Sequence, residues 1–265
     1  MIRKIEKIIK SILRKLGYKK ITSFFQNLFR TRYSLDMYIS QSLIVRDVNT
    51  NAFAKYRNKH IGQDVVLIAT GPSLNKYKPI ENAVNIGVNK TIFKKDINLD
   101  YYFVIDYAAT GSYLKELKNY PNVKKFYATL PYHTYGYKRA VPKLAIIPES
   151  LICEHNASKY YIYSKEPVHP LPLNTEIDKT WLADGGSCIF SAMQFALFTN
   201  PKKIYLVGCD CSSGYFDGGK GADCSFLIKS WQEIKEFAEI YYPDTEIISV
   251  NPVGLKGMFT DLYQE

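Results

Sequence analysis

Residues 65–74, VVLIATGPSL, decide the fold of this chain. Five consecutive apolar residues, partly β-branched, stop at Thr70 and Gly71 and predict a buried parallel strand. Gly71 allows a sharp turn, and Pro72 suits the first turn of a helix because its missing N–H costs nothing there. The N–H groups from Ser73 onward would then face an anion at the carboxyl end of the strand. An ordinary strand-to-helix turn is the alternative.

Length and charge limit the possible architectures. With 265 residues, 46% of them hydrophobic, the chain suits one α/β domain with an appendage. The formal net charge is +10, but residues 1–32 alone contain ten Lys or Arg and one acid. The rest of the chain is therefore nearly neutral, which weighs against nucleic acid as a partner. We expect a basic arm and connector at 1–60 and the α/β domain at 61–265.

The arm has the pattern of a basic amphipathic helix. Its apolar residues share one helical face: Ile2, Ile5, Ile9, Ile12, Leu13 and Leu16. Lys and Arg occupy the other side, and no apolar run is long enough to span a bilayer. Such a helix fits an anionic membrane surface, so residues 1–32 predict a cytoplasmic protein held at the inner membrane face. A helix packed on the body, or one used for oligomerisation, is the alternative.

Further strands are predicted after the first one. They cover residues 83–89, 101–106, 123–129, 144–147, 203–208 and 246–250, with helices at 188–199 and 231–242. Polar residues stand at the carboxyl ends of five strands: Ser73, Asn89, Asp106, Asp210 and Asn251. In a parallel sheet these ends share one edge, where α/β folds place ligands, although each residue alone could be a simple turn residue. The irregular stretch 130–180 predicts a lid or small subdomain.

Two glycine-rich segments add to this predicted site. Gly186 and Ser187 precede helix 188–199 and offer backbone donors to an anion, with a simple N-cap as the alternative. Residues 211–225 carry four glycines directly after Asp210, which predicts a mobile lid, with a disordered surface loop as the alternative. The expected ligand-facing groups of this segment are Tyr215, Asp217, Lys220 and Lys229. The five cysteines form neither a disulfide framework nor a zinc motif, so we expect reduced thiols without a catalytic role.

These motifs also carry a resemblance to known families. The TGPSL turn, the strand ends VN and VID, GGS before a helix, and IYLVGCD before a glycine-rich loop occur in this order between Val65 and Phe259. In this the chain resembles the bacterial domain-of-unknown-function-115 proteins, the MptE-like and Maf flagellin-glycosylation group. It is also similar to the sialyltransferases of glycosyltransferase family 42. The resemblance implies an α/β fold with a variant Rossmann-like, mostly parallel sheet and helices on both faces.

The same resemblance implies a nucleotide-binding site. The residues that match it, together with neighbouring strand-end and loop positions, are Thr70, Gly71, Pro72, Ser73, Asn89, Asp106, Gly186, Ser187, Asp210, Tyr215 and Lys229. The sialyltransferases carry a catalytic His after the lid, where residues 224–231 of this chain contain none. The general base is therefore open among Asp106, His133, His155 and Asp210.

The implied activity is transfer of a sugar from a nucleotide donor. The best match is a sialic-acid-like sugar from a CMP donor, moved onto a hydroxyl of a bacterial surface glycan or a lipid-linked glycan. No cofactor is expected to be required, although Asp106 and Asp210 make Mg²⁺ conceivable. Two alternatives stay open: an MptE-like ATP-dependent pyrophosphokinase, and a non-catalytic nucleotide- or glycan-binding component of polysaccharide assembly.

Overall fold

The computed structural model describes residues 43–105, 111–129, 149–163 and 169–264. The chain divides into two compact units, Met1–Ile44 and Val45–Glu265. The predicted membrane-binding helix within 1–32, the strand predicted at 144–147, and the candidate residues Asp106 and His133 lie outside the described residues. No helix among the described residues is long and apolar enough to cross a membrane. The second unit is described below.

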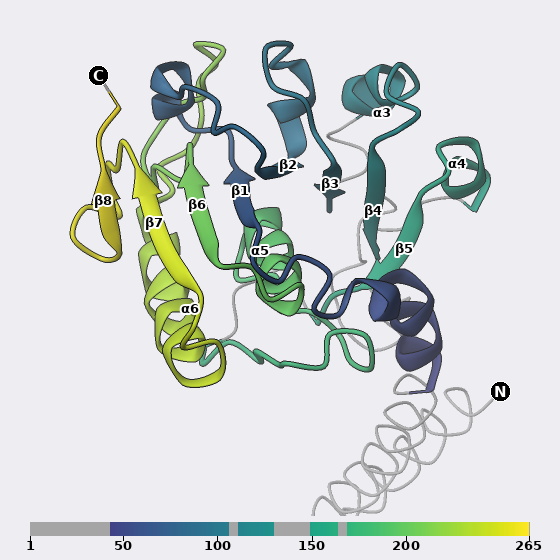
Figure 1. Cartoon of the computed structure of the whole chain (residues 1–265). Helices are drawn as coiled ribbons and strands as arrows, with labels where there is room; N and C mark the ends of the chain where they lie inside the picture. The colour runs from purple at the N-terminus through teal and green to yellow at the C-terminus, as the bar shows by residue number, and fades with distance from the viewer. Residues whose placement is uncertain (1–42, 106–110, 130–148, 164–168, 265) are drawn as a thin grey trace, which may run out of the picture. The chain divides into compact units, whose positions relative to one another are not determined.

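An eight-stranded sheet forms the centre of this unit (Figure 1). Its order is β5-β4-β3-β2-β1-β6-β7-β8, and every pair of neighbouring strands is parallel. The strands are β1 (Asp64–Ile68), β2 (Val84–Val88), β3 (Tyr101–Val104), β4 (Lys124–Thr129), β5 (Ser158–Tyr161), β6 (Lys203–Val207), β7 (Glu246–Val250) and β8 (Thr260–Leu262). The predicted α/β fold with a Rossmann-like parallel sheet is confirmed.

Helices cover both faces of the sheet, as predicted. The helical residues 45–53, α5 (Cys188–Phe198) and α6 (Ile228–Tyr241) pack on one face. The other face carries short elements: η2 (Pro72–Lys76), η3 (Asn89–Phe93), α3 (Gly111–Leu117) and α4 (Glu149–Glu154). The alternation along β1 fits this arrangement, because Val65 and Leu67 face the first layer while Val66 and Ile68 face the second.

Helix α5 is the central support of the sheet. All eleven of its residues are buried, and it packs against β1, β2 and β3. Its Gln194 is satisfied inside the core because its side-chain amide donates to the carbonyls of Ala183 and Phe190, and its oxygen accepts the N–H of Ala183. A helix that is apolar on all sides is expected to be buried in this way.

The domain begins earlier than the sequence predicts. Residues 45–60 were expected to belong to the connector, but Phe53 is fully buried and stacks on Phe126 at a centroid distance of 5.3 Å. The side chain of Asn49, also fully buried, accepts the N–H of Tyr161 at 2.9 Å. The boundary therefore lies near Val45, not Ile61.

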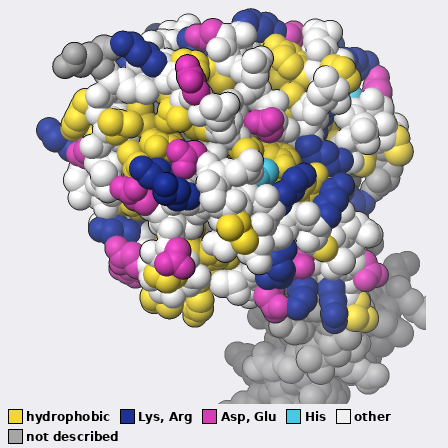
Figure 2. Space-filling model, viewed as in Figure 1, with side chains coloured by type: hydrophobic (Ala, Val, Ile, Leu, Met, Phe, Trp, Pro, Cys, Tyr) yellow, Lys and Arg dark blue, Asp and Glu magenta, His cyan; other side chains and the backbone are white. Residues whose placement is uncertain are grey.

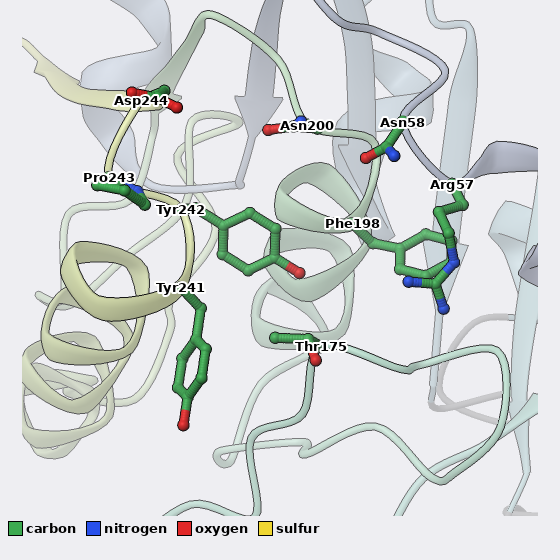
Figure 3. A pocket seen from close by; sticks show the side chains of 9 residues that line it. All are labelled: Arg57, Asn58, Thr175, Phe198, Asn200, Tyr241, Tyr242, Pro243 and Asp244. Carbon is green, nitrogen blue, oxygen red and sulfur yellow. The ribbon is translucent and has the colours of Figure 1, made fainter.

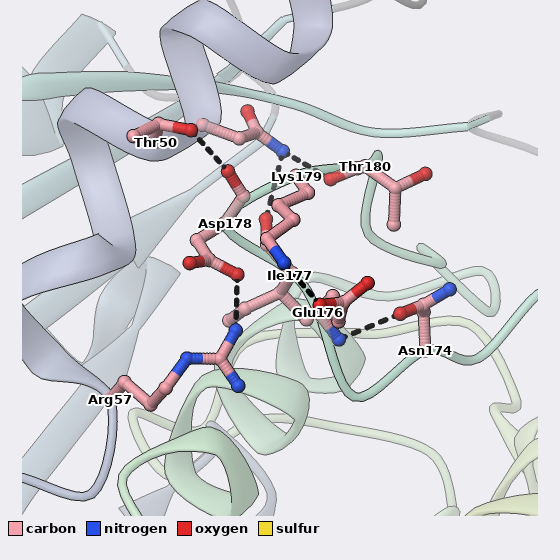
Figure 4. A network of polar contacts seen from close by, with 9 residues as sticks. Thr50, Arg57, Asn174, Glu176, Ile177, Asp178, Lys179 and Thr180 are labelled. Atoms are coloured by element: carbon pink, nitrogen blue, oxygen red, sulfur yellow. Dashed lines mark hydrogen bonds and ion pairs between the residues drawn. The ribbon is translucent and has the colours of Figure 1, made fainter.

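Polar contacts also join this segment to the chain around Asp178 (Figure 4). Arg57 forms an ion pair with the Asp178 carboxylate at 2.6 Å, and the hydroxyl of Thr50 donates to the Asp178 carbonyl at 2.7 Å. The Asp178 side chain is 9% exposed and that of Arg57 is 40% exposed, so water reaches this ion pair from the arginine side.

The stretch 130–180, predicted to be irregular, contains regular structure where it is described. It includes α4 and β5, the latter being an edge strand of the sheet. After β5 the chain returns and forms a parallel bridge between Ile162 and Leu182. The described part of this stretch is therefore built into the sheet and does not form a separate subdomain.

Candidate functional site at the carboxyl edge

The centre of the sheet contains a topological switch point. From β1 the chain proceeds to β2 on one side, whereas β6, the other neighbour of β1, leads to β7 on the opposite side (Figure 1). In open α/β sheets the connections that leave such a pair of strands diverge, and ligands bind in the crevice at their carboxyl ends. The segments that follow β1 and β6 therefore define the candidate site.

Ser73 and Asp210 meet at this switch point. The backbone N–H of Ser73 donates to Oδ2 of Asp210 at 2.8 Å, and the Ser73 hydroxyl donates to Oδ1. Both residues are buried. The N–H of Ser73 is therefore not free for an anion, contrary to the sequence-based expectation, because an internal carboxylate occupies the start of η2.

Gly71 allows Asp210 to approach this closely. Its N–H donates to the carbonyl of Gly208 at 2.9 Å, and a Cβ on Gly71 would lie 2.6 Å from both the Asp210 Cγ and the Gly208 oxygen. With φ at −67°, Gly71 is needed for space and not for backbone conformation. The helix predicted after Pro72 is a five-residue 3-10 turn.

The glycine-rich segment 211–225 lies over η2. The N–H of Phe216 donates to the carbonyl of Thr70 at 3.0 Å, and the Asn75 side chain donates to the carbonyl of Phe216 at 2.7 Å. A Cβ built on Gly214 would lie 3.6 Å from the ring of Pro72. The segment predicted to be a lid thus contacts η2 and the end of β1, at the predicted edge of the sheet.

Lys90, which sequence reasoning missed, holds the tip of this loop. Its ammonium lies 3.1 Å from Oδ2 of Asp217 and 4.2 Å from the centroid of the Tyr215 ring. The pKa of the Asp217 carboxyl is lowered, first by the N–H of Gly219 and then by Lys90. The available sequence signal was the position of Lys90 directly after Asn89, at a strand end.

Two other predicted strand-end residues have structural partners. Asn89 adopts a left-handed conformation (φ +48°), and its carbonyl accepts the hydroxyl of Tyr102 at 2.7 Å. The Asn251 side chain donates to the carbonyl of Lys76 at 3.5 Å and accepts the N–H of Gln264 at 2.9 Å. Asn251 therefore joins η2 to the C-terminal residues.

The second predicted anion site lies at the start of α5. Gly185 and Gly186 have φ of +59° and +89°, and Ser187 is the N-cap residue without a side-chain capping hydrogen bond. The thiol of Cys188 interacts with the backbone of Ile105, just after β3. This places the amino end of α5 beside the carboxyl end of β3, on the same sheet edge as Ser73.

The remaining candidates are distributed elsewhere. His155 precedes β5, and its Nδ1 hydrogen-bonds with the Tyr127 hydroxyl at 2.6 Å, while its carbonyl accepts the ammonium of Lys125, near the start of β4. It therefore lies towards the amino ends of the strands, away from Asp210. Lys229 is exposed on the second residue of α6, and Lys220 is exposed in the glycine-rich loop.

The cysteines and the acidic residues define no further centre. All five cysteines are free, and burial raises the pKa of the Cys188, Cys209 and Cys211 thiols, which keeps them protonated. Among the described residues, no group of three or more His, Cys, Asp or Glu side chains is arranged to hold a metal ion.

Two surface depressions lie away from the switch point. One, of about 260 Å³, is at the amino edge of the sheet (Figure 3). We call it the amino-edge depression; it is lined by Arg57, Asn58, Thr175, Phe198, Asn200, Tyr241, Tyr242, Pro243 and Asp244. The other, of about 380 Å³, lies between α6 and residues 170–175. On the face seen in Figure 2, basic and acidic side chains are interspersed, as the near-neutral body predicts.

Comparisons with known proteins found likeness among solved structures. No protein-family model matches the chain, and no curated protein matches significantly. Among solved structures, the chain is similar to the MAf glycosyltransferase from Magnetospirillum magneticum AMB-1, with 12% sequence identity and a TM-score of 0.48. The match covers 83% of this chain and 38% of that one, so this chain spans about two fifths of that protein's length.

Proposed function

We propose that this protein is a glycosyltransferase that binds a nucleotide-activated sugar at the carboxyl edge of its sheet. The observation that carries the proposal is the meeting of Ser73 and Asp210 at the switch point, next to the glycine-rich loop that contacts Thr70. Open α/β sheets bind nucleotides in this crevice. The order of the sequence motifs, which resembles that of glycosyltransferases, supports the same activity.

The site must deprotonate the acceptor hydroxyl, stabilise the departing phosphate and exclude water. The acceptor hydroxyl attacks the anomeric carbon, the bond from that carbon to the phosphate oxygen breaks, and the hydroxyl proton passes to a base. Donors at the carboxyl edge would stabilise the departing phosphate, and the loop over η2 would exclude water. His155 lies towards the amino edge of the sheet, so we no longer consider it as the general base. The predicted candidates for the base are then Asp106, His133 and Asp210.

The donor and acceptor follow from the sequence resemblance. The best candidate donor is a CMP-activated, sialic-acid-like sugar, and the candidate acceptor is a hydroxyl of a bacterial surface glycan or lipid-linked glycan. Residues 1–32 would hold the enzyme at the anionic inner membrane face, where lipid-linked acceptors are found. No metal is required in this scheme.

A thermal-shift panel tests the nucleotide site. The purified protein is heated with CMP, CDP, UMP, UDP, GDP or ATP, each with and without Mg²⁺. A ligand present at about 100 times its dissociation constant stabilises the fold by about 2.7 kcal/mol, which is a measurable shift. We expect CMP or CDP to stabilise the protein without Mg²⁺. A response to ATP with Mg²⁺ alone would favour the pyrophosphokinase, and no response to any nucleotide would refute the proposal.

A pair of tyrosine variants localises the response. Tyr215 lies on the glycine-rich loop, whereas Tyr241 lines the amino-edge depression. Tyr215→Ala should reduce the nucleotide-induced shift, and Tyr241→Ala should leave it unchanged. Release of nucleotide from a CMP-sugar without acceptor then separates an enzyme from a protein that only binds the donor.

A further inference from the structure

The glycine-rich loop is held by two kinds of contact. At its base, the backbone of Phe216 exchanges hydrogen bonds with Thr70 and Asn75, and none of these groups is charged. At its tip, Asp217 and the Tyr215 ring both contact the Lys90 ammonium. The base of the loop is thus bound to the segment after β1 and to η2, whereas the tip, which has hydrogen bonds of its own, is joined to the end of β2 through Lys90.

The contact at the tip is easily exchanged. The side chain of Asp217 is 42% exposed and that of Lys90 is 26% exposed. Ion pairs that water reaches in this way contribute little to stability, because solvent screens the charges and the side chains lose freedom. A phosphate oxygen, like a carboxylate oxygen, makes strong charge-assisted hydrogen bonds with an ammonium, and a phosphate monoester such as CMP carries more negative charge than a carboxylate. It would therefore compete well with Asp217 for Lys90.

Lys90 also lies beside the crevice. It follows β2, the neighbour of β1, at the carboxyl edge. A Cβ built on Gly219 would lie 3.3 Å from the Lys90 ammonium, and one on Gly214 would lie 3.6 Å from the Pro72 ring. The N–H of Tyr215, next to Gly214, donates to the Gly219 carbonyl at 3.1 Å. The turn formed by residues 214–219 therefore lies between Lys90 and the start of η2, with Gly219 next to Lys90 and Gly214 next to Pro72.

We propose that Lys90 is the phosphate ligand of this site and that Asp217 is an internal competitor for it. A phosphate group of the donor displaces the Asp217 carboxylate from the Lys90 ammonium, and the loop tip at 217–219 is released while its base stays bound to Thr70 and Asn75. No covalent bond changes in this exchange. This inference rests on the proposed function, since it names a residue that recognises the donor of the same site.

The proposal is tested by removing the charge of each partner of the ion pair in turn, because it predicts opposite effects on binding for the two substitutions. Binding of CMP and of inorganic pyrophosphate is measured by calorimetry for the wild type, Lys90→Gln and Asp217→Asn. We expect Lys90→Gln to weaken binding about 10- to 100-fold, because a charged hydrogen bond to the ligand is lost. Asp217→Asn should strengthen binding up to about fivefold, because the competing carboxylate is gone.

A control and a second measurement complete the design. Lys94 pairs with Asp96 at 3.1 Å on the same segment, so Lys94→Gln removes an equal charge nearby and should leave binding unchanged. Hydrogen exchange of the ligand-free variants should rise at 217–219 for both Lys90→Gln and Asp217→Asn, which confirms that the pair holds the tip.

The outcomes separate the two proposals. If the ion pair only holds the loop, both substitutions change binding in the same direction or not at all, and the assignment of Lys90 is overturned while the nucleotide site stands. If the wild-type protein binds neither CMP nor pyrophosphate, the proposed donor site fails and the role of Lys90 fails with it.

Discussion

The carboxylate of Asp210 accepts both the backbone N–H and the hydroxyl of Ser73, although 137 positions separate the two residues in the sequence. This contact joins the ends of β1 and β6 at the point where the chain changes direction across the sheet. A carboxylate at the start of η2 also matches the partial positive charge of the N–H groups at that end. The first turn of η2 is therefore ordered before any ligand binds.

Removing the Asp210 carboxylate should destabilise the fold. Asp210→Ala leaves two buried donors of Ser73 without a partner, so the free energy of unfolding should fall by about 2–4 kcal/mol. Ser73→Ala should cost less, about 1 kcal/mol, because the N–H of residue 73 still reaches Asp210. Urea denaturation of both single variants and the double variant measures the coupling. Strictly additive effects would show that the two side chains do not interact.

Gly71 is expected to tolerate no side chain. In Gly71→Ala the new Cβ would lie 2.6 Å from Asp210 and from the Gly208 carbonyl, so we expect a loss of about 1–3 kcal/mol. Gly218→Ala is the matched control: its φ of +78° costs about 1 kcal/mol, but no atom lies within 4 Å of its Cβ. Denaturation midpoints compare the two. A smaller effect at Gly71 than at Gly218 would contradict the close approach.

The domain boundary predicts how the chain responds to truncation. A chain that starts at Val45 keeps Asn49 and Phe53, both fully buried in the domain, and should unfold cooperatively. A chain that starts at Ile61 loses both residues together with Tyr56, and removal of each buried aromatic ring costs about 3–5 kcal/mol. Such a loss approaches the whole stability of a domain. Calorimetry of the two chains checks this, and a cooperative transition for the shorter one would refute the boundary.

Acid should weaken the fold before the carboxylates titrate. Burial lowers the pKa of His60 and His155 below the usual value of 6.5. Below that value the unfolded chain binds protons that the folded protein excludes, so stability falls as the pH falls. The free energy of unfolding should be lower at pH about 5.5 than at pH about 7.5. The double variant His60→Gln/His155→Gln should lose this slope, and an unchanged slope would assign it to other groups.

The sheet could largely be predicted from the sequence, because its central strands are apolar runs between turns. The strands Asp64–Ile68, Lys203–Val207 and Glu246–Val250 were predicted to within a residue or two of their ends. The short edge strand β8 was missed because its residues, Thr260–Leu262, are half-exposed or exposed and carry no apolar signal. Phe53 was assigned to the connector although Val45, Val48, Ala52 and Phe53 recur at helical spacing, a signal in the sequence that was missed.

The location of the candidate site could be predicted, but its contacts could not. Polar residues at strand ends point to the carboxyl edge whatever their partners are, and Ser73 and Asp210 do meet there. Which carboxylate fills the start of η2 depends on strand order, which local sequence does not show. Lys90 was missed because a lysine after a strand resembles any surface lysine until Asp217 and Tyr215 are placed against it.

Hydrogen exchange of the whole protein with and without CMP tests the central claim most directly. The account predicts slower exchange on CMP binding at residues 70–76 and 89–93, on the carboxyl edge, and no change at the amino-edge depression, where residues 57–58, 198–200 and 241–244 lie. Protection confined to the amino-edge depression, or no protection at saturating CMP, would contradict a donor site at the switch point.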